Sequence, residues 1–392
     1  MPREYFEIPG LPTDGRLCHN QAMDMVEALI PNTPFRSCHA ADLLETCDGD
    51  LICVWFAGSS EGYADISIVG SRLPAGESRW TLPVKLTDDP VRSEQNPSLF
   101  QHPNGDIWLM YTAQVARTDE TPKDYSLQFT AEIRRRVSHD QGKTWEPAET
   151  MFDRPGSFCR QKIQILSSGR WIFGNWYCFE DKTRNGSDMT VFHISDDQGK
   201  TWRSVEVPGS EGRVHANVIE IKPGCLTAYM RSRFADHIWM SESTDDGEHW
   251  TVPFRTELRN NNSSISAIRL QSGAVGIIYN DVAFSEEPSA PKALWPDQRC
   301  PVTIALSEDG GYTWPWRRVI EHGEGFTGPW NDINNRRYEY PVMLQGRDGL
   351  IHTAWSWGSR SQVKYAAVTE GWIRGSRISR GIDDEGKHFC IR

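Results

Sequence analysis

The sequence predicts an all-β protein, a six-bladed β-propeller with four antiparallel strands in each blade. Two repeats predict this fold, an octapeptide that recurs four times and a pair of apolar strands that recurs six times. Gly (32), Pro (23) and Trp (16) are plentiful among 392 residues, which favours short strands and tight turns over long helices. We expect one domain over residues 1–392, with the blade repeats at about 35–372.

The octapeptide Ser-x-Asp-x-Gly-x-Thr-Trp, an Asp-box, is found at residues 138–145, 195–202, 243–250 and 307–314. His249 replaces the threonine in the third copy. Short Ser and Asp side chains hydrogen-bond the backbone of a turn, and Gly accepts a positive φ. The Trp then returns the chain to the sheet and covers apolar surface. We therefore interpret the boxes as architectural turns between the third and fourth strands of four blades.

A glycine turn between two apolar strands recurs out of phase with the Asp-boxes. The turn glycines are Gly49, Gly105, Gly169, Gly224, Gly273 and Gly349. A third strand follows each pair after a variable loop, so each unit supplies one four-stranded blade. A seventh blade stays open if residues 1–30 hold more than one strand. We expect instead that this segment adds an outer strand to the last blade, which closes the ring and removes its edges.

Two stacked β-sandwiches are the alternative architecture, but they would not explain one repeat along the whole chain.

The net charge of −11, with no long basic stripe, argues against nucleic acid as a partner. No stretch is long and apolar enough to cross a membrane.

The N-terminal stretch MPREYFEIPGLPTDGR lacks a positive start followed by an apolar core, so we expect a cytoplasmic protein. Nine cysteines without CxxC spacing suit reduced thiols in that compartment. Metal ligation around Cys18-His19 or Cys38-His39 is the alternative. Neither pair has a second close pair, so we expect no metal and no other cofactor. The oligomeric state stays open.

The starts of the inner strands are almost wholly polar. In a propeller the first strand of each blade is innermost, and its start points toward the axis on the face opposite the Asp-boxes. The residues nine to eleven positions before the turn glycines are His39, Gln95 and Asn96, Arg160, His215, Asn262 and Ser263, and Tyr338 to Tyr340. A structural core would prefer apolar residues here. The ring therefore predicts a ligand-binding constellation. The alternative is that these groups bond one another and buried water around a central channel.

The loops after the second strands open on the same face and add polar and aromatic residues. They include Glu61, Asp65, Gln114, Tyr177, Arg231, Arg233 and Trp357. Arginine suits the bidentate capture of a carboxylate, and aromatic rings suit the faces of sugars. Together with Arg160, these residues predict a locally positive pocket for an acidic oligosaccharide.

The Asp-boxes and the stretches SCHAADLL, SEQNPSLF, NNNSSISAIRL and YEYPVMLQ resemble the sialidase superfamily of BNR/Asp-box repeat proteins. This resemblance implies a sialidase-type propeller that acts on carbohydrate. Sialidases hold a carboxylate with three arginines and use a Tyr nucleophile helped by Glu and an Asp acid. By this resemblance Tyr340 matches the nucleophile and Asp65 the acid, and Arg231 or Arg233 matches one arginine. Where sialidases carry Arg-Ile-Pro, this chain has Ser37-Cys38-His39-Ala40.

The stretches SRLPAGESRW, MRSRFADHIWMS and SEDGGYTWPWRR are similar to a second branch, the propeller lyases that cleave rhamnose from glucuronate in plant gum. This resemblance implies β-elimination at a rhamnosyl-glucuronate linkage. The reaction needs the C5 proton removed, the carboxylate neutralised and a proton given to the leaving oxygen. Arg160, Arg231 and Arg233 would neutralise the carboxylate. His39 and His215 are candidate acid/base groups at neutral pH, and Tyr340 is a candidate acid.

We therefore expect catalytic roles for His39, His215, Arg231 and Tyr340. The residues expected to bind substrate are Asn96, Arg160, Arg233, Asp65, Glu61, Tyr177, Gln114, Asn262 and Trp357. A lyase acting on a uronate-containing oligosaccharide is the first hypothesis. A sialidase-like glycoside hydrolase is the second, and a non-catalytic glycan-binding propeller is the third.

Overall fold

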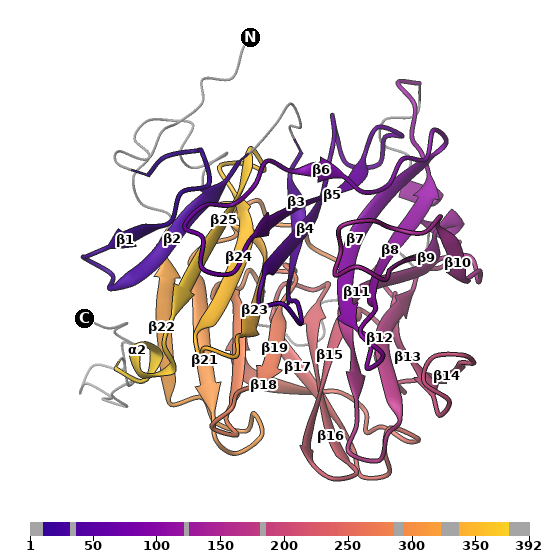
Figure 1. Ribbon diagram of the computed structural model, residues 1–392. Helices are drawn as coiled ribbons and strands as arrows, with labels where there is room; N and C mark the ends of the chain where they lie inside the picture. The colour runs from indigo at the N-terminus through magenta and orange to yellow at the C-terminus, as the bar shows by residue number, and fades with distance from the viewer. Residues whose placement is uncertain are drawn as a thin grey trace.

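The computed structural model describes residues 11–31, 37–120, 125–180, 186–285, 293–322 and 337–375. Its strands form six antiparallel sheets, which confirms the predicted six-bladed propeller. In Figure 1 the first strands of the sheets lie around the middle of the molecule, while β1, β10, β14 and β22 lie at its periphery.

The first three blades follow one another along the chain, each beginning with its inner strand. Blade one holds β3 (His39–Glu45), β4 (Leu51–Ala57), β5 (Ser67–Leu73) and β6 (Val84–Lys85). Blade two holds β7 (Arg92–Gln101), β8 (Ile107–Val115), β9 (Glu132–Ser138) and β10 (Glu149–Phe152), with the 3₁₀ helix η1 (Tyr125–Thr130) between β8 and β9. Blade three holds β11 (Ser157–Ile165), β12 (Trp171–Tyr177), β13 (Met189–Ser195) and β14 (Arg203–Glu206).

The remaining blades continue the same order. Blade four holds β15 (Arg213–Lys222), β16 (Cys225–Ser232), β17 (His237–Ser243) and β18 (Phe254–Arg259). Blade five holds β19 (Ser266–Arg269), β20 (Val275–Asn280), β21 (Val302–Ser307) and β22 (Trp316–Glu321). Blade six holds β23 (Glu339–Gln345), β24 (Ile351–Trp357) and β25 (Gln362–Val368), together with β2 (Met25–Ile30) and β1 (Cys18–Asn20).

Blade six is assembled from both ends of the described chain. Strand β2 pairs antiparallel with β25, from Val26 opposite Ala367 to Ile30 opposite Val363, and β1 pairs with β2. The N-terminal region therefore adds two strands, where the sequence predicted one. This pairing joins the last blade to the start of the chain and covers the outer edge of β25.

The apolar core is divided among the spaces between neighbouring blades. One cluster, for example, joins Val54 and Phe56 of β4 to Leu99 of β7 and Leu109 of β8. Similar clusters join each of the other neighbouring blades, and the last returns from blade six to blade one. Because each sheet is covered on both faces, even its middle strands are nearly continuously apolar.

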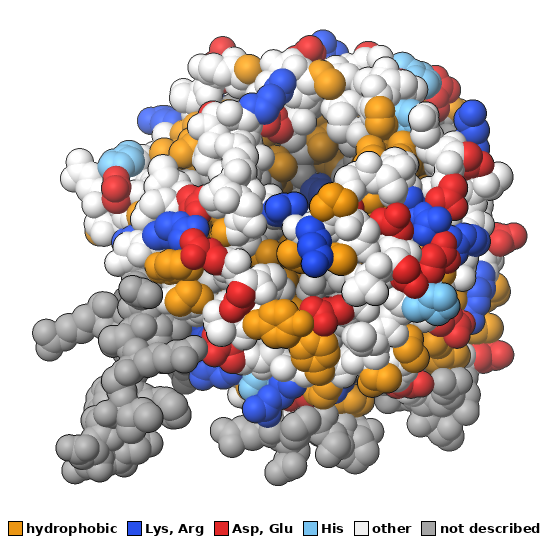
Figure 2. Space-filling view, turned by 90° about the horizontal axis from the view of Figure 1, so that it is seen from below, with side chains coloured by type: hydrophobic (Ala, Val, Ile, Leu, Met, Phe, Trp, Pro, Cys, Tyr) orange, Lys and Arg blue, Asp and Glu red, His pale blue; other side chains and the backbone are white. Residues whose placement is uncertain are grey.

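One face of the molecule can be seen in Figure 2 and is mixed in charge. Figure 2 shows basic and acidic side chains interspersed with hydrophobic ones on the face seen from below. The helix α2 (Glu370–Arg374) follows β25 and buries Trp372 and Ile373 in the core between blades five and six. In the part of the chain that the structure describes, no helix is long and apolar enough to span a membrane.

The four Asp-boxes join the third and fourth strands of blades two to five and share one hydrogen-bond pattern. In each box the serine hydroxyl accepts a bond from the glycine N–H at 2.7–3.0 Å. The aspartate Oδ1 accepts the backbone N–H four residues later at 2.8–3.0 Å. His249 preserves this pattern, because its Nδ1 lies 2.7 Å from Asp245 Oδ2 where a threonine hydroxyl stands in the other boxes. The boxes lie at the ends of the strands remote from the inner-strand starts.

We predict that Asp309→Ala lowers the free energy of unfolding by about 2–3 kcal/mol, because the change removes bonds to an ionised acceptor. Asp309 accepts bonds from the Thr313 N–H at 2.9 Å, the Thr313 hydroxyl at 2.6 Å and the Ser307 hydroxyl at 2.7 Å. Equilibrium unfolding in urea measures the loss. The matched control Asp48→Ala, at an exposed turn position, should change stability by less than about 0.5 kcal/mol. An equal loss in both variants would contradict an architectural role for the box.

Candidate active site

Five of the six inner strands bend in their first half, or shortly before they begin, at a residue in the left-handed backbone region. These residues are Ala40, Asn96, His215, Asn262 and Tyr340, with φ between 51° and 61°. The pairing register shifts at this point in β3, β7, β15 and β23, as in a β-bulge. Such backbone is strained for residues like His and Tyr and is found mostly at functional sites. The bends gather side chains from different blades at the axis.

Tyr340 is at the centre of this gathering. Its hydroxyl accepts a hydrogen bond from Arg231 Nη1 at 2.5 Å. The centroid of its ring lies 4.2 Å from that of His39 and 5.5 Å from that of His215. Three guanidinium carbons lie 5.2–5.7 Å from the ring centroid, those of Arg160, Arg231 and Arg299. Burial alone would raise the pKa of Tyr340, but Arg231 and Arg299 outweigh it and lower the pKa below its usual value.

His215 is buried, and one tautomer explains its contacts. Its Nδ1 lies 2.9 Å from the Ser264 hydroxyl and its Nε2 lies 3.3 Å from Arg231 Nη1. A guanidinium can only donate, so Nε2 accepts and Nδ1 carries the proton. The ring stacks on Trp176 with centroids 4.2 Å apart. Burial first, and then the charge of Arg231, hold the pKa of His215 well below its usual value, so the ring is neutral at pH 7.

His39 directly precedes Ala40, the residue at which β3 bends, and has 1% of its surface exposed. Its Nδ1 lies 2.9 Å from the Ser356 hydroxyl and 3.3 Å from Glu339 Oε2. Burial lowers the pKa of His39 well below its usual value, Arg360 lowers it further, and the carboxylate of Glu339 opposes them. Two neutral imidazoles therefore flank Tyr340.

Glu339 is a buried carboxylate among cations. Its Oε1 lies 3.2 Å from Arg299 Nη1, and its Oε2 accepts a hydrogen bond from Arg360 Nε. Arg360 also donates to Glu61 Oε2 at 2.6 Å. Burial would raise the pKa of Glu339, but Arg360 and Arg299 hold it well below its usual value, so the group is ionised. These contacts form a chain of ion pairs from the axis to the loop between β4 and β5.

The three arginines predicted to neutralise a carboxylate differ in their bonding. Arg231 bonds Asn262 Oδ1 at 2.8 Å through Nε, and burial lowers the pKa of Arg231 to about 10, so it stays charged at neutral pH. Arg160 donates to backbone carbonyls, the shortest bond being 2.7 Å to Ala41. Arg233 is paired with Asp188 through two nitrogens, at 2.9 and 2.6 Å. Arg231 is therefore the one of the three whose guanidinium bonds the Tyr340 hydroxyl.

The other predicted binding residues are spread over a wider region. Asn262 contacts Arg231, and Asn96 lies at the bend of β7. Asp65 is exposed and accepts two bonds from Ser59 at 2.8 Å, while Glu61 pairs with Arg360. The structure does not bring the remaining three to Tyr340. The Tyr177 hydroxyl lies 3.3 Å from Ser204 of the outer strand β14, Trp357 lies in the core between blades five and six, and Gln114 is buried opposite Ser93.

Arg299 and Glu339 are central to the site but were not among the residues predicted to act. Glu339 directly precedes Tyr340, and the bend of β23 turns both side chains toward the axis. Arg299 lies near the end of the long loop between β20 and β21, outside the spacing of the repeats. Glu339 could have been found from the sequence, because it stands next to Tyr340 at the polar start of an inner strand. Arg299 could not, because it lies outside the repeated segments.

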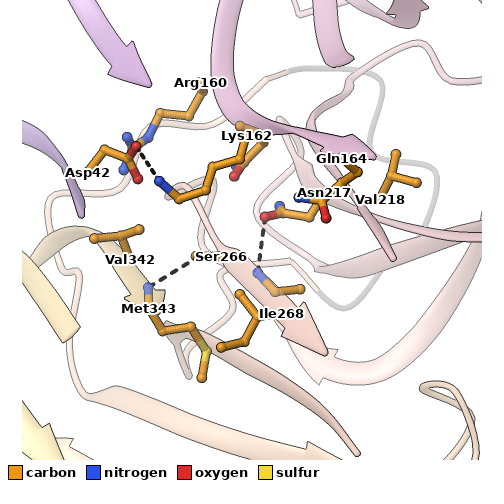
Figure 3. Close-up of a pocket in the computed structure, with 12 residues that line it drawn as sticks. Asp42, Arg160, Lys162, Gln164, Asn217, Val218, Ser266, Ile268, Val342 and Met343 are labelled. Carbon is orange, nitrogen blue, oxygen red and sulfur yellow. Dashed lines mark hydrogen bonds and ion pairs between the residues drawn. The ribbon is translucent and has the colours of Figure 1, made fainter. Parts of the chain in front are cut away.

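A small polar cavity lies on the axis, further along the inner strands. It has a volume of about 30 Å³ and is lined by five inner strands. Figure 3 shows Asp42, Arg160 and Lys162 on one side, and Asn217 and Ser266 on the other. Lys162 Nζ lies 2.6 Å from Asp42 Oδ2. The space would hold about one water molecule. At this height along the axis, the inner-strand side chains therefore surround a small polar channel, which is the alternative that the sequence left open for the ring of polar residues.

The alternative of a metal site around Cys18-His19 or Cys38-His39 finds no support among the residues that the structure describes. Within them, no group of three His, Cys, Asp or Glu side chains lies close enough to hold a metal ion. His19 pairs with Asp24 near the surface, and His39 belongs to the axial site. The eight described cysteines are free thiols.

Comparison with solved structures finds the same fold in proteins of low sequence identity. A Hadza microbial sialidase matches with a TM-score of 0.69 and 19% identity over 86% of this chain and 66% of its own. A Dyadobacter fermentans protein of unknown function matches with a TM-score of 0.66 and 16% identity over 87% and 97%. The intramolecular trans-sialidase of Ruminococcus gnavus matches with a TM-score of 0.63 and 14% identity over 88% and 96%.

This chain thus spans just under two thirds of the Hadza sialidase. No curated protein matches the sequence. The model of the BNR repeat-like domain matches residues 49–353, which is more than half of the chain and includes all four Asp-boxes. The protein therefore belongs to the BNR repeat-like domain family, and its six-bladed propeller has the same fold as these sialidases.

Proposed function

We propose that the protein is a carbohydrate-active enzyme that cleaves an acidic oligosaccharide by β-elimination beside a uronate, at a rhamnosyl-glucuronate linkage. The observation that carries this proposal is the environment of Tyr340. Its hydroxyl contacts a guanidinium at 2.5 Å and its ring lies between two neutral imidazoles. The sialidases among the structural neighbours support a glycan as the class of substrate.

The two arginines beside Tyr340 suit the first requirement of the reaction. A uronate carboxylate must be neutralised before the proton on the adjacent C5 becomes acidic enough to remove. Arg231 is fully buried and Arg299 is 7% exposed, so their charges act in a region with little water. The side-chain Nε of Arg299 has no hydrogen-bond partner in the structure. We therefore assign the binding of the substrate carboxylate to both groups.

Proton transfer is assigned to His39 and Tyr340. Nε2 of neutral His39 takes the C5 proton, and the electrons of the C5–H bond form the C4–C5 double bond as the C4–O4 bond breaks. The Tyr340 hydroxyl gives its proton to O4, so rhamnose leaves with a hydroxyl group and an unsaturated uronate remains. A proton then returns from His39 to Tyr340, which restores both groups without consuming water. His215 contacts Arg231 through Nε2, so its role is to position that arginine.

A sialidase-like hydrolase is the second candidate, and a specific observation favours it. A tyrosine with a lowered pKa beside arginines is also a better nucleophile, and Asp65 stands on the neighbouring loop. However, the hydroxyl of Tyr340 contacts Arg231, and two neutral imidazoles, which accept protons, lie beside its ring. This arrangement supports elimination better than nucleophilic attack.

We predict that incubation with a rhamnosyl-glucuronate oligosaccharide produces absorbance near 235 nm, the signal of an unsaturated uronate. Tyr340→Phe should lower kcat/KM by about 100-fold or more, because the leaving oxygen loses its proton donor. The control Tyr365→Phe removes a buried hydroxyl that bonds His352 at 2.7 Å in blade six and should keep full activity. Release of free sialic acid from sialosides, without absorbance on any uronate glycan, would replace the lyase by the hydrolase.

We predict that Arg299→Met lowers kcat/KM by about 100- to 1,000-fold, as removal of one preorganised charge donor does in other enzymes. Methionine keeps much of the side-chain length without the charge. Arg170→Met, which breaks ion pairs with Asp196 and Glu248 on the Asp-box face, should change kcat/KM less than twofold.

The wild-type enzyme should not cleave an oligosaccharide in which the uronate carboxyl group at C6 has been reduced to an uncharged alcohol. Equal cleavage of the reduced and acidic substrates would disprove carboxylate recognition.

The pH profile of kcat/KM provides an independent check. His39 acts as a base, so kcat/KM should rise with pH through its lowered pKa and be constant by pH 6.5. Tyr340 acts as an acid, so kcat/KM should fall as pH rises through a pKa below the usual value of 10. Rates measured from pH 4 to 10, with stability followed in parallel, give both limits. An acid limb centred at or above pH 6.5 would not fit a buried, neutral histidine.

A further inference from the structure

We infer that Glu339 is a positioning residue that keeps the proton of His39 on Nδ1 and so leaves Nε2 as the basic nitrogen. This inference rests on the proposed function for its catalytic meaning. The position of the proton itself is a property of the protein alone. It can therefore be tested without any substrate.

The contacts of His39 Nδ1 determine where the proton must be. An ionised carboxylate only accepts hydrogen bonds, and Glu339 Oε2 lies 3.3 Å from Nδ1. An unprotonated Nδ1 would place a nitrogen lone pair against carboxylate oxygens in a buried site. The Ser356 hydroxyl, 2.9 Å from the same nitrogen, accepts or donates equally well and so does not choose the tautomer. Glu339 is therefore the group that selects the Nδ1–H form.

The geometry holds Glu339 rigidly in this role. The carboxylate is 2% exposed and is bonded on two sides, by Arg299 through Oε1 and by Arg360 through Oε2. Arg360 is in turn fastened to Glu61 at 2.6 Å. The left-handed backbone of Tyr340 fixes the direction of the strand at this point. Consequently Glu339 cannot turn away from the imidazole without breaking two ion pairs.

The charged and polar groups that face His39 come from several elements. They are Glu339 and Tyr340 of β23, Ser356 of β24, Arg360 after β24, Arg160 of β11 and Arg299 of the loop before β21. Among these, Glu339 is the one anion, and it opposes the effect of the three arginines on the pKa of His39. Its removal would leave His39 both a weaker base and free to exchange tautomers.

The first experiment is NMR of the wild-type protein labelled with ¹⁵N-histidine at pH 7. The two ring nitrogens differ in ¹⁵N shift according to which carries the proton, and His39→Gln identifies the signals of His39 among the 11 histidines. We expect the Nδ1–H pattern for His39. The Nε2–H pattern would overturn the inference and would leave the lyase proposal standing, with Nδ1 as a different candidate base.

The second experiment uses Glu339→Gln, in which an amide of the same shape can donate or accept. We expect a mixed or reversed tautomer signal, a fall in kcat of at least about tenfold, and an acid limb of kcat/KM at lower pH than in the wild type. If Glu339 only stabilised the fold, Glu339→Gln would lower the fraction of folded protein. It would leave the tautomer of His39 and the pH of the acid limb of kcat/KM unchanged. That result would contradict the inference.

The matched control is Glu27→Gln, which neutralises another buried carboxylate of blade six. Glu27 is 8% exposed and pairs with Lys364 at 3.0 Å, on a strand remote from the axis. Loss of the Glu27 charge should change neither the tautomer of His39 nor the pH profile.

If Glu339→Gln does not fold, Ser356→Ala tests which group selects the tautomer. It removes the neutral partner of Nδ1, so the Nδ1–H signal should persist. Loss of that signal would show that the serine, and not Glu339, selects the tautomer.

Discussion

Charge compensation at the axis is the constraint on which the site depends. Arg160, Arg231 and Arg299 are buried at the axis, and Arg360 lies beside them and is partly exposed. Uncompensated cations at this depth would destabilise the fold. Strand β23 supplies the compensation, because Glu339 pairs with two of the arginines and the hydroxyl of Tyr340 accepts from a third. Arg160 is stabilised differently, by backbone carbonyl groups.

The same compensation decides which chemistry suits the pocket. Cations favour the ionised forms of tyrosine and glutamate and the neutral forms of the two histidines. Neutral imidazole is a proton acceptor, and a tyrosine with a lowered pKa is a better proton donor at neutral pH. Both properties suit the proton transfers of the proposed elimination. The four arginines outnumber Glu339 and Glu61, so the site is locally positive although the protein as a whole carries −11, and this charge suits the acidic substrate that we propose.

The fold could be read from the sequence because its signals are local and repeated. Each Asp-box forms its hydrogen bonds within eight residues, so even the replacement by His249 could be recognised as the same turn. The closing of the ring was harder to predict, since β1 and β2 carry no repeat and pair with the far end of the chain.

The site was predictable only in part, and the reason is geometric. His39, His215, Asn262 and Tyr340 could be found because the turn glycines set their place in each blade. Arg299 lies at the end of a long loop whose length the repeats do not determine, so its contact with Glu339 appears only in three dimensions. Tyr177 and Trp357 were placed by the same spacing, but strand ends alternate in direction, and their side chains face an outer strand and the core.

The composite sixth blade has a consequence for how the protein is made. During synthesis β1 and β2 leave the ribosome before the other described strands, and β25, the partner of β2, leaves after them. The ring cannot close until β25 is available, so for this time the edge of β2 that pairs with β25 lacks its partner, while β1 can already pair with the other edge. Glu339 and Tyr340 also belong to the last inner strand to emerge. A nascent chain therefore lacks the charge balance at its axis until the final blade is complete, and a chain that stalls before that point would have neither a closed ring nor a site.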